Sequence, residues 1–139
     1  MAQANIDIGF HTRSHCDCGE LRSASDFKYE IVDGVEELRG ELGAPVRYFA
    51  FPYGLPQNIP IAGIQAVYEA GFEAFCSAFG AYNFPGQDSF HIRRMHGDPE
   101  FSRLKNWLSF DTRKLNLQPE IRYWLPPASN WEETKALVG

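Results

Sequence analysis

Several features that mark other classes of protein are missing from this chain of 139 residues. No apolar run approaches the roughly 20 residues of a membrane-spanning helix, which argues against a membrane protein. The opening residues 1–5 lack the basic start and apolar core of an export signal, so we expect a cytoplasmic location by default. Internal repeats and low-complexity tracts are also missing. The sequence therefore predicts an ordinary globular protein.

Cysteine is scarce. The three cysteines, Cys16, Cys18 and Cys76, are an odd number and do not indicate a disulfide framework. Cys16 and Cys18 directly follow a histidine, which leaves open a mixed His/Cys zinc site. Structural zinc sites space their cysteines by about two to four residues, so one intervening residue is tight. Cys76 is interpreted as a small buried strand residue.

Positive charge is in deficit, with a net charge of −5, which argues against a general nucleic-acid binder. The imbalance is uneven: residues 1–90 hold 12 acidic and 5 basic residues, whereas residues 91–139 hold 6 and 8. Several basic residues lie between Arg93 and Lys114. They form either a solvated face or a surface for acidic glycan.

The residues that are present predict a hydrophobic core, since 44% are apolar and 14% aromatic. Hydrophobic periodicity and turn residues predict alternating strands and helices. The predicted strands cover residues 6–10, 47–51, 72–77 and 90–95. The predicted helices run from Ser23 or Ser25 to about Leu42, from about Pro60 to Gly71, from Pro99 past Leu108, and from Ser129 onward. Repeated strand–helix units indicate an α/β fold with mostly parallel strands and helices outside.

Residues 11–15 carry the strongest chemical signal: His11-Thr12-Arg13-Ser14-His15. Histidine is the commonest metal ligand, and a four-residue step brings two side chains to the same side of a helical turn. The alternating segment before His11 predicts a strand, which places His11 at its carboxyl end. Catalytic groups of α/β folds lie at that edge, so His11 and His15 are candidate metal ligands.

This histidine motif resembles the second motif of the polysaccharide deacetylases of the NodB-homology group (carbohydrate esterase family 4), whose two histidines bind a divalent metal, commonly zinc. Residues 49–54, Phe-Ala-Phe-Pro-Tyr-Gly, are similar to the third motif, which lines the active-site groove. Residues 90–98 resemble the strand and loop that close the domain in one branch. The resemblance implies a single partial deacetylase-like domain over residues 1–139, with a core at 6–115 and a C-terminal extension at 116–139.

One family feature is missing. Members carry an Asp-Asp pair before the histidine motif, of which one aspartate is the catalytic base and the other completes the metal site. This sequence contains no Asp-Asp pair. The resemblance therefore implies the C-terminal portion of an irregular (β/α) barrel of the NodB-homology / glycoside hydrolase–deacetylase type. An incomplete barrel has an open edge, so we expect this chain either to pair with a second copy in a homo-oligomer or to be marginally soluble alone.

The function that the resemblance implies is metal-dependent hydrolysis of N-acetyl groups on amino-sugar polysaccharides. Its partners would be an N-acetylated glycan and a divalent metal, in the first place Zn²⁺, with no nucleic acid and no membrane. His11 and His15 would hold the metal. The backbone N–H of Tyr53 would stabilise the developing oxyanion, and Phe51 and Pro52 would line the groove with it.

Two further assignments depend on the same resemblance. Many members have an arginine where Ala50 stands, which holds the catalytic aspartate. Arg94 is a candidate replacement that would face the substrate, against a surface or structural role. His96 is the first candidate for the family's late acid histidine and His91 the alternative, against packed or surface histidines.

Three functions stay open at this point. The first is a deacetylase-like domain whose chemistry needs residues outside this chain. The second is a non-catalytic remnant or carbohydrate-binding module that keeps the groove around Tyr53. The third is a zinc-stabilised interaction module that uses His11, His15, Cys16 and Cys18. Zinc sites normally use three or four protein ligands, so two histidines alone should hold the metal weakly.

Overall fold

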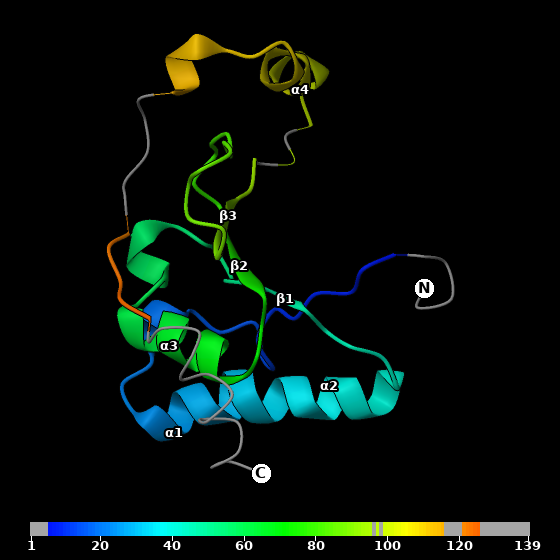
Figure 1. Cartoon of the computed structure of the whole chain (residues 1–139), viewed down its shortest axis with the longest axis vertical. Helices are drawn as coiled ribbons and strands as arrows, with labels where there is room; N and C mark the ends of the chain where they lie inside the picture. Colours follow the sequence, from blue (N-terminus) through cyan, green and yellow to red (C-terminus); the bar gives the residue numbers. More distant parts are fainter. Residues whose placement is uncertain (1–5, 96, 98, 116–120, 126–139) are drawn as a thin grey trace.

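The computed structural model describes residues 6–95, 97, 99–115 and 121–125. Three short strands form a parallel sheet in the order β1-β2-β3: β1 (Tyr48–Ala50), β2 (Ala74–Ser77) and β3 (His91–Arg93). Helix α3 (Ile61–Glu69) connects β1 to β2 (Figure 1). The predicted α/β class is therefore confirmed, and the strands at 47–51, 72–77 and 90–95 form in shorter versions.

One long helical stretch precedes the sheet and consists of α1 (Ala24–Phe27), the π-helical segment η3 (Lys28–Asp33) and α2 (Gly34–Leu42). Ser23 begins it with a capping box, because its side chain accepts from the Asp26 N–H while the Asp26 side chain accepts from the Ser23 N–H. Gly43 ends it in the left-handed conformation at φ 58°. These caps confirm the helix predicted from Ser23 to Leu42.

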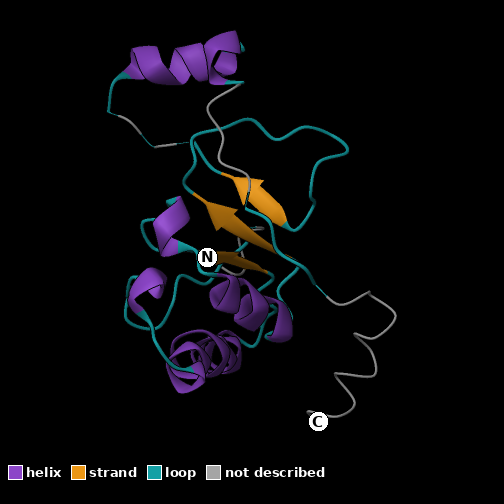
Figure 2. Ribbon diagram, turned by 90° about the vertical axis from the view of Figure 1, so that its left-hand side faces the viewer, coloured by secondary structure: helices purple, strands orange, loops and turns teal. Residues whose placement is uncertain are grey.

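The hydrophobic core lies between the sheet and the helices. Figures 1 and 2 both place α1–η3–α2 and α3 on the same side of the sheet. Alternate strand residues face these helices and are fully buried, and their rings meet edge to face: Phe49 lies 4.8 Å from Phe51, and Phe51 lies 5.5 Å from Phe75. The helices contribute Ile31, Val35, Ile64 and Val67 to the same cluster.

The N-terminal segment runs beside β1. Of the strand predicted at residues 6–10, Phe10 alone forms a parallel bridge, with Phe49. The Phe10 N–H donates to the carbonyl of Tyr48, and the Ala50 N–H donates to the carbonyl of Phe10, each at 2.8 Å. This pairing delivers residue 11 to the edge of the sheet at which β1 ends.

Helix α4 (Phe101–Leu108) lies beyond β3, at the opposite end of the molecule from α1 and α2 (Figure 1). Its Trp107 packs on the ring of Tyr82 at 5.0 Å, and the Tyr82 hydroxyl donates to the carbonyl of Trp107. The helix predicted from Pro99 therefore begins two residues later. The helix predicted from Ser129 lies outside the described residues.

Three single-turn helices complete the described elements: η2 (Cys18–Glu20), η4 (Pro56–Asn58) and η5 (Thr112–Lys114). Over the described residues the sheet is open, and it does not close into the barrel that the resemblance implied. None of the helices in this part of the chain has the length and apolar character needed to cross a membrane.

Candidate active site at the carboxyl edge of the sheet

His11 stands directly after the Phe10 bridge, beside the last residue of β1. Its Nδ1 lies 2.6 Å from the carbonyl oxygen of Ala50. A carbonyl can only accept, so Nδ1 carries the proton and Nε2 is the nitrogen with the free lone pair. Partial burial lowers the pKa of His11, and the nearby His15 and Arg94 lower it further, against the effect of the Ala50 bond. The imidazole is thus held neutral, as a metal ligand must be.

His15 and Tyr53 complete a small aromatic group. The rings of His11 and His15 lie 4.9 Å apart, and the exposed ring of Tyr53 lies 5.4 Å from that of His15, both edge to face. The structure therefore brings together one residue of the third family motif and both histidines of the second.

Strained backbone marks the same two loops. Four non-glycine residues of the described part have positive φ, and three belong here: Thr12 at 61°, His15 at 60° and Tyr53 at 60°. A β-branched residue such as Thr12 is a true outlier in this region. Such strain costs about 1–3 kcal/mol per residue and clusters at functional sites, where the surrounding structure enforces it.

Arg94 lies near His11, at the carboxyl ends of β1 and β2. Its guanidinium donates from Nε to the carbonyl of Ser77 at 3.0 Å and from an Nη to the carbonyl of Phe51 at 3.3 Å. It therefore joins the ends of two strands and places a positive charge near His11. These bonds give Arg94 a structural role, and whether it also meets a substrate stays a prediction.

The structure corrects the placement of Phe51 and Pro52. Both side chains are fully buried, and the ring of Phe51 packs between Phe49 and Phe75 in the core. A side chain with no exposed surface cannot touch a glycan, so the prediction that these two side chains line the groove is wrong. Of the three residues Phe51, Pro52 and Tyr53, Tyr53 alone is exposed, at 60%.

His91 is not available as the acid histidine. It is 3% exposed, its ring stacks on Phe75 at 4.7 Å, and its Nε2 lies 2.8 Å from the Ser77 hydroxyl. Burial lowers its pKa to about 4, and Arg93 acts in the same direction. His91 is therefore a neutral core residue near pH 7. The preferred candidate, His96, lies outside the described residues.

The cysteines do not join the histidines. Cys18 is fully buried in the hydrophobic core, and that burial strongly raises the pKa of its thiol. Burial also raises the pKa of Cys16, with Glu30 adding to the effect. The described residues contain no group of three or more His, Cys, Asp or Glu side chains placed to hold a metal.

The site thus has the type of ligand that a metal needs, but too few ligands. A histidine whose Nδ1–H is held by a backbone carbonyl is a common arrangement for a metal ligand, because the bond fixes the tautomer and aims Nε2. His11 has this arrangement, and with His15 the site has two histidines, fewer than the three or four ligands of ordinary zinc sites.

Two supporting residues escaped the sequence analysis. Asn58 is buried and donates to the Asp17 carboxylate at 2.6 Å, which ties the Tyr53 loop to the histidine loop. Glu30 is also buried and accepts two hydrogen bonds from Ser14. A signal for Glu30 exists: it lies three residues after Phe27 and next to Ile31, at the edge of the apolar stripe of the helix.

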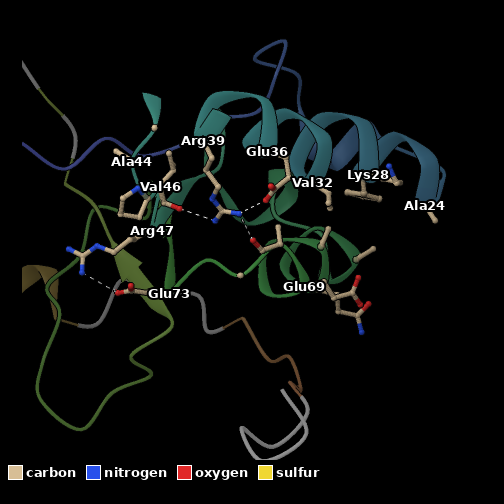
Figure 3. Close-up of a pocket in the computed structure, with 18 residues that line it drawn as sticks. Ala24, Lys28, Val32, Glu36, Arg39, Ala44, Val46, Arg47, Glu69 and Glu73 are labelled. Atoms are coloured by element: carbon tan, nitrogen blue, oxygen red, sulfur yellow. Dashed lines mark hydrogen bonds and ion pairs between the residues drawn. The ribbon is translucent and has the colours of Figure 1, made fainter. Parts of the chain in front are cut away.

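A surface groove lies elsewhere among the described residues. It runs between the long helix and α3 and contains no histidine or cysteine (Figure 3). Arg39 crosses it, donating to the carbonyls of Ala70 and Val46 and pairing with Glu36 at 2.7 Å. This groove is a seam between two helices, bridged by Arg39, and neither histidine of the motif lines it.

Comparison with known families agrees with the geometry. A family model described as polysaccharide deacetylase matches residues 1–75, more than half of the chain. This chain belongs to the polysaccharide deacetylase family. The matched region contains the histidine motif, the Pro-Tyr-Gly turn and both buried supports, Glu30 and Asn58. No individual curated protein matches the chain.

Proposed function

We propose that this polysaccharide deacetylase family member hydrolyses N-acetyl groups of amino-sugar polysaccharides in a metal-dependent reaction. His11 and His15 would hold the metal, most simply Zn²⁺. The proposal depends on one observation: the two imidazoles meet at 4.9 Å at the carboxyl edge of the sheet, with His11 fixed in the tautomer that leaves Nε2 free.

The chemistry divides between the metal and the chain. His11 and His15 would supply nitrogen ligands to Zn²⁺, which would act there as a Lewis acid. Among the described residues, none accepts a hydrogen bond from the backbone N–H of Tyr53, which lies in a strained turn. This N–H is therefore suited to stabilise the oxyanion of acyl transfer. Arg94 adds positive charge beside His11.

The third ligand and the catalytic base would come from residues outside those described here, or from another chain. The same holds for the closure of the open sheet into a (β/α) barrel of the family type. A second copy that pairs at the open sheet edge is one source, and analytical ultracentrifugation tests it: a concentration-dependent dimer is expected, and a monomer at all concentrations would exclude that source.

Zinc binding tests the metal site directly. Calorimetric titration of the wild type should show one weak site per chain, and His11→Ala or His15→Ala should abolish it. His91→Gln is the matched control, because it removes a histidine that lies in the core and should leave the heats unchanged. Equal heats for wild type and His11→Ala would refute the assignment.

A second candidate, a non-catalytic glycan-binding protein, is favoured by the small number of ligands found among the described residues. Acetate release from N-acetylated chito-oligosaccharide separates the two. Turnover that a chelator blocks and zinc restores supports the deacetylase. Binding of the oligosaccharide without acetate release, weakened by Tyr53→Ala, supports the second candidate.

A further inference from the structure

A buried carboxylate lies directly beneath the histidine loop. Glu30 belongs to η3 and is 7% exposed. Its Oε2 accepts from the backbone N–H of Ser14 at 3.0 Å, and its Oε1 accepts from the Ser14 hydroxyl at 2.8 Å. Its backbone carbonyl accepts from the N–H of Arg13, also at 3.0 Å. One glutamate thus holds Arg13 and Ser14 of the five-residue loop, residues 11–15.

These bonds act on the residues between the two strained positions. Thr12 and His15 both have positive φ, and Arg13 and Ser14 stand between them. A strained backbone conformation of this kind persists only when neighbouring contacts enforce it. The Glu30 bonds are such contacts, because they hold the two residues that lie between the strained positions.

The π-helical segment and Gly34 explain how the glutamate reaches the loop. Local π-helical turns are frequent at functional sites because they displace side chains from their α-helical directions. Gly34 permits the close approach: a Cβ atom there would lie 2.6 Å from the Phe10 ring and 3.3 Å from the Cβ of Arg13. The absence of a side chain at Gly34 therefore allows the helix to lie this close to Phe10 and Arg13.

We propose that Glu30 is a positioning residue for the two histidines. Its carboxylate holds the loop in the strained conformation in which the imidazoles of His11 and His15 converge. The proposed effect of Glu30 on the positions of the two rings does not require a metal. The proposed effect of Glu30 on metal affinity rests on the function proposed above.

The test compares Glu30→Ala with Glu30→Gln in the full chain. The amide of Gln can accept from the Ser14 N–H through its oxygen and donate to the Ser14 hydroxyl through its nitrogen, so Gln should restore what Ala removes. By NMR, contacts between the ring protons of His11 and His15 should be present in wild type and Glu30→Gln and lost in Glu30→Ala. Zinc affinity by calorimetry should fall about 10–100-fold in Glu30→Ala, as for other residues that orient metal ligands.

Glu37→Ala is the matched control. Glu37 lies on the next turns of the same helical stretch and pairs with Arg13 of the same loop at 2.7 Å, but its side chain is 57% exposed. It should change neither the ring contacts nor the affinity. Far-UV circular dichroism checks that each variant is folded. If Glu30→Ala does not fold, Ser14→Ala decides the question, because it removes the hydroxyl bond at an exposed position and should weaken the ring contacts.

The outcomes separate the two proposals. Ring contacts that persist in Glu30→Ala, or in Ser14→Ala where that variant decides, overturn the role of Glu30 whatever the metal does. A wild type that binds no zinc, with ring contacts that still disappear in Glu30→Ala, removes the metal site and leaves the role of Glu30 intact.

Discussion

The buried imidazole of His91 makes stability depend on pH, and replacing it by glutamine should remove that dependence. In the folded protein burial lowers the pKa of His91 to about 4, whereas an unfolded histidine titrates near 6.5. A pKa difference of about 2.5 between the unfolded and folded states lowers the free energy of unfolding by roughly 3 kcal/mol at a pH below both pKa values. Glutamine is uncharged and can still hydrogen-bond to the buried Ser77 hydroxyl, which would otherwise lose its partner.

The sign follows from proton binding. Between about pH 6.5 and pH 4 the unfolded chain binds the proton and the folded chain does not, so protonation stabilises the unfolded state. Stability from this group is fully present above about pH 6.5 and is lost as the pH falls toward 4. Wild type should therefore lose about 2–3 kcal/mol more than His91→Gln between about pH 7.5 and pH 4.5.

Urea denaturation followed by circular dichroism at several pH values measures this difference. Carboxylates and the other histidines contribute to both proteins and cancel in the comparison. Equal losses in wild type and His91→Gln would mean that His91 is accessible to protons in the folded state. That result would also reopen its assignment as an acid histidine.

Three further predictions follow from packing and burial. Gly34→Ala should lower the free energy of unfolding, measured by urea denaturation, by about 1–3 kcal/mol, because the new methyl group would overlap the Phe10 ring. Asn58→Ala should cost about 1–3 kcal/mol in the same assay, because it leaves buried polar groups without partners; a change below about 0.5 kcal/mol would contradict the buried network. Iodoacetamide should label half-buried Cys16 before Cys18 in the native state, with mass spectrometry to locate the label, and equal rates would place Cys18 at the surface.

Local signals in the sequence predicted most of the helices and strands. Ser23 and Gly43 bound the long helix because their side-chain and backbone properties act within a few residues, without help from the rest of the fold. The family resemblance of the histidine motif and the Pro-Tyr-Gly turn implies that these two loops share one site. Both loops follow strands that end at the same edge, so their encounter follows from a parallel sheet.

Side-chain direction was harder to predict. Phe51 was assigned to the groove from its motif, although it shares strand parity with Phe49, and both rings face the helices. Glu30 borders the apolar stripe of the helix, but no local pattern predicts the π-helical segment in which it lies. The open sheet reflects contacts among elements distant in sequence, which neither periodicity nor capping encodes.

The hydrogen bond from His11 to Ala50 spans 39 residues of sequence, and the intervening chain contains the whole long helix. The converged imidazoles are consequently a product of high-contact-order tertiary structure, which forms late because loop closure must come first. A cation that prefers this geometry should couple thermodynamically to folding, adding about 2.7 kcal/mol when free metal stands at a hundredfold excess over its dissociation constant. A rise in thermal midpoint with added zinc would thus report assembly of the native chain even where no acetate is released.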